Sequence, residues 1–181
     1  PADGLPASQL TAAVESVVYD SEGSVWAKFP EQAFVSRYDG GQWRHDDLPE
    51  GLAEKRQHLP HRATRLQRLR EGCLVAAVPG RGACFFDGRH WTGYPSLGAL
   101  VEARAETLRK VIDNGHARDA GAALLGVDVG GRIWAVDVRD PFESTPEYFQ
   151  PTFRVYDGRE WHNMVGFFVL GPDATVCARK T

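Results

Sequence analysis

The chain has 181 residues, of which 43% are hydrophobic and 10% aromatic, so it can bury a sizeable core. Its net charge of -3 gives no reason to expect nucleic acid or an anionic membrane surface as the partner. No apolar run approaches the roughly 20 residues of a membrane-spanning helix. The N-terminal stretch lacks the basic start and apolar core of a signal peptide, so the sequence assigns no compartment.

The three cysteines are an odd number and show no CxxC spacing. Neither a disulfide framework nor a structural zinc site is therefore expected. We expect Cys73, Cys84 and Cys177 to be buried thiols.

The first predicted element is a hairpin at residues 20–27, "DSEGSVWA". The phrase returns as "DVGGRIWA" at residues 128–135, so the shared pattern is Asp-x-x-Gly-x-(Val/Ile)-Trp-Ala. An Asp at the first position can accept hydrogen bonds from amides of a tight turn, and Gly at the fourth tolerates positive φ. The pattern therefore predicts one strand before the turn and a second strand through the Trp.

A second phrase, aromatic-Asp-Gly-x-x-Trp, occurs at residues 37–43, 85–91 and 155–161. Asp-Gly favours a type I′ turn, in which both central residues have positive φ, so each phrase predicts a second hairpin. Two successive hairpins make a four-stranded antiparallel blade. The repeated positions that define it are Asp20, Gly23, Trp26, Asp39, Gly40, Trp43, Asp87, Gly88, Trp91, Asp128, Gly131, Trp134, Asp157, Gly158 and Trp161.

The repeats predict a single repeat domain over residues 1–181. In chain order its units are blade 1 at residues 12–46, blade 2 at 62–94, an amphipathic helix at 96–114, blade 3 at 121–164 and a half blade at 165–181. Blade 2 has Leu69 and Val75 in the Asp and Trp places of the first phrase. The helix is expected to end at Asn114-Gly115, and the proline-containing segment 139–153 reads as a long loop.

These units predict an all-β, β-propeller-like fold of about three and a half four-stranded antiparallel blades with one inserted amphipathic helix. The glycines of the first phrase lie 49 and 59 residues apart, against roughly 40 to 50 residues per blade in propeller repeats. The inserted helix explains the longer step. Because the chain lacks an initial Met and its fourth unit offers two strands, we expect a partial ring, completed by further sequence or further chains.

The two phrases resemble the repeats of two-component-regulator β-propellers, which carry D-x-x-G-x-I/L-W and then a strand ending in Tyr/Phe-Asp. The matching residues are Asp20, Gly23, Trp26, Tyr38, Asp39, Asp128, Gly131, Trp134, Tyr156 and Asp157. The chain departs from that family after the Trp, where Ala-Lys and Ala-Val stand in place of Gly-Thr. The resemblance implies a ligand-sensing or protein-binding propeller, frequently outside the cytoplasm, and transfers no catalytic residue.

The five tryptophans allow two interpretations, an aromatic platform for carbohydrate or packing between blades. Their fixed place in the repeat favours packing. The repeat aspartates favour turn chemistry over calcium, because each turn offers one Asp and lacks a dense set of oxygen ligands. His58 and His61 have the spacing of a metal pair, but no third ligand is evident and no metal site is assigned.

A basic segment from Lys55 to Arg70 interrupts this net acidic chain. Its candidate contacts to phosphate or to an acidic partner are Lys55, Arg56, Arg62, Arg65 and Arg68. The alternative is a solvated face, on a connector and an outer strand or on a short helix at residues 63–71. We favour the solvated face.

The sequence contains no phosphate loop, nucleophile elbow or HExxH motif, so no catalytic residue and no cofactor are assigned. His45, His90 and His162 lie near the second Trp of the repeat but in three registers, so strand alternation separates them. We expect a noncatalytic module that recognises a protein, further blades or a small-molecule ligand. The alternative is an enzyme on a propeller scaffold, with an active site formed by loops that converge on one face.

Overall fold

The computed structural model describes residues 14, 16–20, 22–29, 32, 34–49, 65–78, 82–114, 123–137, 152–164, 168–170 and 176–178. The chain divides into two compact units, Pro1–Ser96 and Leu97–Thr181, and each is described by itself. Among the described residues, no helix is long and apolar enough to cross a membrane.

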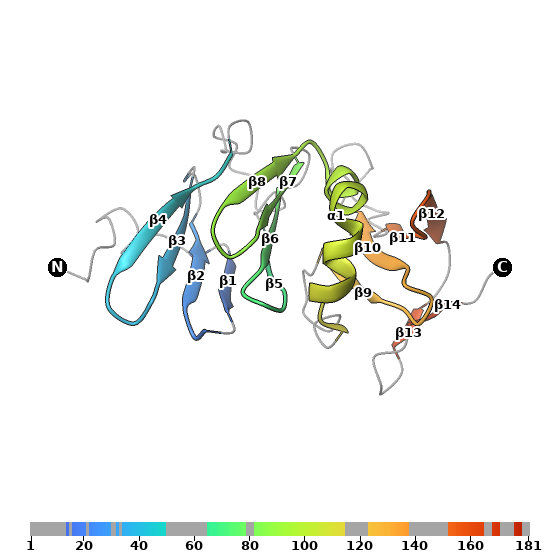
Figure 1. Cartoon of the computed structure of the whole chain (residues 1–181), viewed down its shortest axis with the longest axis horizontal. Coiled ribbons are helices and arrows are strands. Elements are labelled where there is room, and N and C mark those ends of the chain that lie inside the picture. The colour runs from blue at the N-terminus through green and yellow to red at the C-terminus, as the bar shows by residue number, and fades with distance from the viewer. Residues whose placement is uncertain are drawn as a thin grey trace, which may run out of the picture. The chain divides into compact units, whose positions relative to one another are not determined.

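The first unit contains two antiparallel sheets, in each of which every strand pairs with the next along the chain (Figure 1). The strands of blade 1 are β1 (Ser16–Tyr19), β2 (Val25–Lys28), β3 (Phe34–Tyr38) and β4 (Trp43–Asp47). Those of blade 2 are β5 (Arg65–Arg68), β6 (Leu74–Val78), β7 (Gly82–Phe86) and β8 (Trp91–Tyr94).

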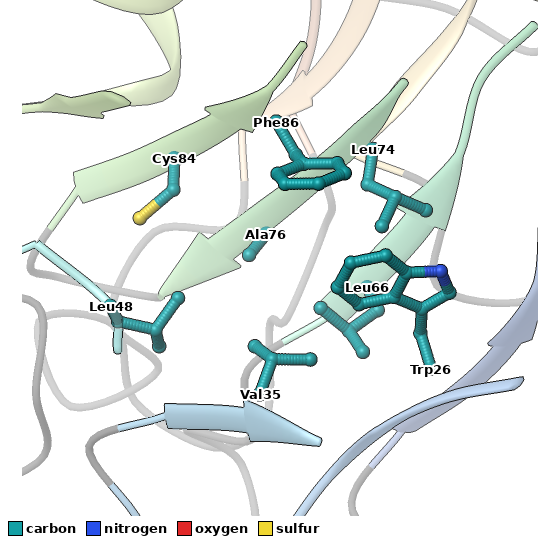
Figure 2. Close-up of a cluster of buried hydrophobic side chains, with 8 residues drawn as sticks. All are labelled: Trp26, Val35, Leu48, Leu66, Leu74, Ala76, Cys84 and Phe86. Carbon is teal, nitrogen blue, oxygen red and sulfur yellow. The ribbon is translucent and has the colours of Figure 1, made fainter. Parts of the chain in front are cut away.

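The core of the first unit lies between these two blades. Figure 2 shows Trp26 and Val35 of blade 1 pointing toward side chains of blade 2. The buried cluster consists of Trp26, Val35, Leu48, Leu66, Leu74, Ala76, Cys84 and Phe86. Burying a large apolar side chain contributes about 1.5 to 3 kcal/mol, so this cluster is a main source of stability for the pair of blades.

The second unit begins with helix α1 (Leu97–Val111) and continues into a third four-stranded antiparallel sheet and a two-stranded sheet (Figure 1). The strands of blade 3 are β9 (Leu124–Val127), β10 (Ile133–Asp137), β11 (Thr152–Tyr156) and β12 (Trp161–Met164). Strands β13 (Phe168–Leu170) and β14 (Val176–Ala178) form the short sheet.

Helix α1 packs against β10 with one apolar stripe. Leu100, Val101, Leu108 and Val111 are buried at the i, i+1, i+8 and i+11 positions of one helical face. The backbone departs from helical geometry at Arg104, where φ is -121° and ψ is 15°. The helix ends at Val111, three residues before the predicted stop at Asn114.

Asn114 instead pairs with the edge of blade 3. Its Oδ1 accepts a hydrogen bond from the Val127 amide at 2.7 Å, and its Nδ2 donates to the Val127 carbonyl at 2.9 Å. A Cβ on Gly126 would lie 2.9 Å from Asn114 Oδ1, so only glycine fits there without a shift of the amide. The Asn114 side chain thus makes the hydrogen bonds that a neighbouring strand would make to the outer edge of β9.

The architecture confirms the predicted fold class. The chain is an all-β, propeller-like protein, and its described residues form three four-stranded antiparallel blades, one inserted amphipathic helix and a two-stranded half blade. The prolines of the predicted loop at residues 139–153 lie outside the described residues.

Candidate functional site

The first repeated turn is built around the carboxylate of Asp20. Its Oδ1 accepts hydrogen bonds from the amides of Glu22 at 2.9 Å and Ser24 at 2.8 Å. Its Oδ2 accepts a third, from Trp26 Nε1 at 2.8 Å. The turn closes with Gly23 at φ 84°, a value that favours glycine. The predicted turn role of Asp20 therefore agrees with the structure, whereas its bond to the indole was not predicted.

Blade 3 repeats this arrangement on Asp128. Oδ1 accepts from the amides of Gly130 and Arg132, at 2.9 and 3.1 Å, and Oδ2 accepts from Trp134 Nε1 at 3.1 Å. The Arg132 guanidinium also donates to Oδ2 at 2.7 Å. Burial opposes ionisation of Asp20 and of Asp128, but the indole and amide donors outweigh it and lower the pKa of both carboxyl groups.

Blade 2 loses both members of this pair together. Leu69 and Val75 occupy the Asp and Trp places, and both side chains are buried. Without the carboxylate the turn changes type, because Glu71 and Gly72 both take positive φ, 57° and 70°. The Cys73 amide donates to the Arg70 carbonyl across them, which makes this a type I′ turn.

The Asp-Gly phrases form hairpins, but our assignment of type I′ turns to them was wrong. Only the glycines take positive φ, 86° at Gly40, 93° at Gly88 and 103° at Gly158. The last paired residues of the two strands are the aromatic residue before the Asp and the second Trp, as in Tyr38 and Trp43, so each loop has four residues. The physical reason is the Asp side chain, which occupies two loop amides and stabilises a longer loop.

The same carboxylate geometry recurs in all three Asp-Gly loops. Asp87 Oδ1 accepts from the amides of Arg89 and His90, each at 2.9 Å. Asp157 Oδ1 accepts from those of Arg159 and Glu160 at 2.8 and 2.9 Å, and Asp39 makes the corresponding, longer bonds to Gly41 and Gln42. Each repeat aspartate in the described chain therefore serves its own turn.

In blades 1 and 3 the second oxygen of the loop aspartate meets the residue that follows the second Trp. In blade 1 Arg44 lies 3.3 Å from Asp39 Oδ2, and in blade 3 His162 Nε2 lies 2.9 Å from Asp157 Oδ2. The Glu160 and Arg159 amides and His162 lower the pKa of the Asp157 carboxyl. Asp157, Glu160 and His162 could together face a cation, but all are exposed and the aspartate oxygens already have hydrogen-bond partners.

The three histidines serve three different environments, as their registers predict. His45 Nδ1 lies 3.1 Å from Ser36 Oγ and its ring lies against Phe34. His90 contributes its amide to the Asp87 loop, and His162 contacts Asp157. They do not converge on a shared position.

The tryptophans fall into two structural classes. Trp26 and Trp134 are 1% and 2% exposed, each with its indole N–H bonded to the turn aspartate. The other three are half-buried and pair with the aromatic residue that precedes the Asp-Gly loop. The centroid distances are 5.2 Å for Tyr38–Trp43, 5.1 Å for Phe86–Trp91 and 5.3 Å for Tyr156–Trp161.

The register places these two classes on opposite faces of blades 1 and 3. In blade 1, Tyr38 pairs with Trp43 in one row, and Trp26 pairs with Arg37 in the next, which points the other way. We call the face with the Tyr or Phe and its partner Trp the ring-pair face. The opposite face, which carries Trp26 in blade 1, is called the indole face.

Trp26 joins the indole face of blade 1 to the ring-pair face of blade 2. Its ring meets Phe86 edge-on (Figure 2), with the ring centroids 4.9 Å apart. It also meets the ring of Trp91, with the centroids 6.2 Å apart. For Trp26 the structure therefore supports packing between blades, since a side chain that is 1% exposed offers no platform to a sugar.

Three charged side chains of blade 1, Arg37, Asp46 and Lys28, lie on the same face of the sheet as Trp26. The Arg37 guanidinium lies 5.1 Å from the Trp26 ring centroid and 3.1 Å from Ser24 Oγ. Burial raises the pKa of the Asp46 carboxyl, although Arg37 acts in the opposite direction. Lys28 is 1% exposed and donates to the Phe29 carbonyl at 2.6 Å. Sequence reasoning missed this buried lysine, although strand alternation places it on the same face as Trp26.

Two of the five candidate basic contacts lie in a strand. Arg65 and Arg68 are the ends of β5, so the strand alternative is correct and the short helix over residues 63–71 is wrong. Between them Leu66 and Gln67 are both buried. Because neighbouring residues of a strand point to opposite faces, both faces of β5 are covered at this point. Lys55, Arg56 and Arg62 lie outside the described residues, as do His58 and His61.

The thiols of Cys73 and Cys84 are buried, as predicted. Burial raises the pKa of Cys84 to about 12, so this thiol is protonated and unreactive at neutral pH. The side chain of Cys177 lies outside the described residues.

Helix α1 is fixed to blade 3 by two polar contacts. Trp161 Nε1 donates to Glu102 Oε1 at 2.8 Å, so the helix lies over the ring-pair face of this blade. Arg109 Nε donates to the Gly131 carbonyl at 2.7 Å, at the turn that Asp128 caps. The side chain of Arg109 also lies against Gly158, where a Cβ would come within 3.0 Å of its guanidinium.

The recurrence of capped hairpins, ring pairs and four-stranded meanders defines a β-propeller-like repeat protein. Neither a protein-family model nor a curated protein matches the chain. Among solved structures it is similar to selenomethionine-substituted virginiamycin B lyase from Staphylococcus aureus, with 12% identity and a TM-score of 0.47 over 91% of this chain and 48% of that one.

Two structures of YCF48 are also similar to the chain. The one bound to D1 peptide has 13% identity and a TM-score of 0.37, over 84% of this chain and 40% of that one. YCF48 from Cyanidioschyzon merolae has 14% identity and a TM-score of 0.34, over 87% and 41%. The chain spans less than half the length of all three structures, and these similarities transfer no residue and no activity.

Proposed function

We propose that the chain is a noncatalytic recognition module of the sensor-propeller type, related to the propellers of two-component regulators. It works as part of a larger protein or assembly. Its loops and ring-pair faces contact a protein partner, further blades or a small ligand. The basic side chains Lys55, Arg56, Arg62, Arg65 and Arg68 are secondary candidates for contacts to an acidic partner.

The observation that carries this proposal is that the repeat aspartates form hydrogen bonds within their own turns and loops. Asp20 and Asp128 bind turn amides and an indole, and Asp39, Asp87 and Asp157 bind loop amides. A catalytic carboxylate needs an oxygen directed at substrate, whereas these oxygens hold a scaffold. A rigid scaffold that presents loops is typical of recognition domains.

The experiment is a structure of the natural full-length protein with its ligand or partner, together with metal analysis of the purified protein. A contact surface formed by loops or blade faces, without stoichiometric metal, is expected. Polar side chains from several blades converging on a bound small molecule or metal would instead establish the alternative, an enzyme on this scaffold.

A further inference from the structure

The ring-pair faces of the three blades are equivalent by register but differ in what covers them. In blade 2 this face is buried within the first unit, with Leu66 at 7%, Leu74 at 0% and Phe86 at 3% exposure. Trp26 and Val35 from the indole face of blade 1 cover it (Figure 2). The ring-pair face of a blade can therefore be covered by the indole face of another blade.

Blade 3 has a different cover on the same face. Helix α1 packs on β10, and Glu102 binds the N–H of Trp161, the ring-pair tryptophan. The helix therefore packs on β10, the second strand of the blade, and contacts β12, the fourth strand, through Glu102. Ile133, in the same row of the sheet as Trp161, is 0% exposed.

The ring-pair face of blade 1 is exposed along its first strand. Val17 is 45% and Tyr19 62% exposed, and both lie on the face of Tyr38 and Trp43. Val17 holds the place in the register that Leu66 holds in blade 2. With Val14 just before the strand, they are three of the four large hydrophobic side chains exposed in the described part of the chain.

We propose that this face of blade 1 is a docking surface for one further blade from outside residues 1–181, whose second strand carries a tryptophan in the place of Trp26. The inference rests on the proposed function and names the partner surface. It follows from the packing already present in the first unit, where the same row of positions receives an indole face. The ring pair of blade 1 has the same centroid spacing as that of blade 2, 5.2 against 5.1 Å.

A blade fits this surface better than a helix or a second copy does. Helix α1 packs on β10 of blade 3, whereas the exposed residues of blade 1 lie on its first strand. Val17 on that strand is the counterpart of Leu66, which belongs to the buried cluster that Trp26 and Val35 form with blade 2. A second copy has no indole to offer from Trp26 or Trp134, because these are 1% and 2% exposed within the chain itself.

The test is photo-cross-linking in the full-length protein, in the cells that naturally make it. Tyr19 is replaced by p-benzoylphenylalanine, and Val129, which is 106% exposed in a turn of blade 3, carries the same probe as the matched control. The Tyr19 probe is expected to form an adduct with a peptide outside residues 1–181 that contains an Asp-x-x-Gly-x-x-Trp phrase. The Val129 probe should not form that adduct.

Val17→Lys should reduce the Tyr19 adduct by about tenfold or more, because an ammonium buried without a partner opposes docking. Val129→Lys should leave it unchanged. An adduct with residues 1–181 of a second copy, an adduct with a segment that lacks the phrase, or no adduct overturns the inference. If the native protein is nonetheless larger than this chain and binds a partner elsewhere, the proposed function stands without this surface.

Discussion

At the scale of single residues, the repeat depends on an aspartate that has two structural tasks. One oxygen of Asp20 holds the turn amides and the other holds the indole N–H of Trp26. The turn task follows from the Asp-x-x-Gly spacing. The indole task has a weaker signal, the joint replacement of Asp and Trp by Leu69 and Val75 in blade 2. That signal emerges only when the blades are compared with one another.

The carboxylate of Asp20 predicts an acid-labile contribution to stability. Its folded pKa lies below the ordinary value of 3.8, so the unfolded chain takes up the proton first as pH falls. The contribution is complete above that ordinary pKa and is lost as pH falls through the lower, folded pKa. Asp20→Asn should therefore lower the free energy of unfolding at neutral pH and flatten its decline in acid, measured by urea melts across pH.

The control for this experiment is Asp47→Asn, which removes an exposed carboxylate at the end of β4. A variant of Asp20 that keeps the full acid dependence of the parent would contradict the assignment of the turn carboxylate.

Trp134 predicts the cost of losing a buried repeat tryptophan. Because its side chain is 2% exposed and its N–H is bonded to Asp128, Trp134→Ala should cost about 3 to 5 kcal/mol of unfolding free energy. Trp43→Ala, at a half-buried site, should cost less. Denaturant melts would measure both. A loss below about 1 kcal/mol at Trp134, with impaired carbohydrate binding, would favour the platform interpretation.

At the scale of elements, strands and helix were predictable because their periods differ. Alternation and the two phrases locate the blade strands, and the apolar spacing between Leu97 and Val111 locates the helix. The type of the loops was harder to predict from the sequence. The length of the Asp-Gly loops depends on side-chain hydrogen bonds from Asp39 and its equivalents, and a dipeptide preference does not contain them.

Helix α1 predicts a sharp contrast between its two faces. Leu108 is buried against the unit, so Leu108→Asp places an unpaired charge in an apolar contact and should lower stability by several kcal/mol, on the order of a severe core substitution. Ala103→Asp introduces the same charge on the exposed face and should change little. Thermal melts and sizing chromatography of both variants would compare them, and equal behaviour would mean that the helix is not packed on blade 3.

The ends of β9 and α1 could not be predicted from local patterns. Asn114 reads as a helix stop, yet its amide group pairs with Val127 as a strand would. The reason is tertiary, because the amide needs Gly126 beside it and a free strand edge. Gly126→Ala should therefore destabilise the second unit, since its Cβ would lie 2.9 Å from Asn114 Oδ1. An unchanged melting temperature would show that the amide moves away without cost.

At the scale of the whole molecule, blades 1 and 2 show that a blade is stabilised by its neighbour. Repeat architectures gain much of their stability from the interfaces between units, and a unit that lacks a neighbour leaves apolar surface in water. The exposed Val17 and Tyr19 of blade 1 contrast with the covered row of blade 2. The sequence predicts the repeats, but only the strand register shows that the exposed side chains lie on the ring-pair face of blade 1.

The mass of the native, unproteolysed species in solution, with identification of its full-length polypeptide, tests whether further blades or chains complete the repeat. We predict a species heavier than 20.0 kDa, in which further blades or chains complete the repeat. Hydrogen exchange should then show β1 protected in the assembly and exposed in the isolated chain. A stable, soluble native monomer of 20.0 kDa, with all its sheet edges already protected from exchange, would contradict completion of the repeat by further blades or chains.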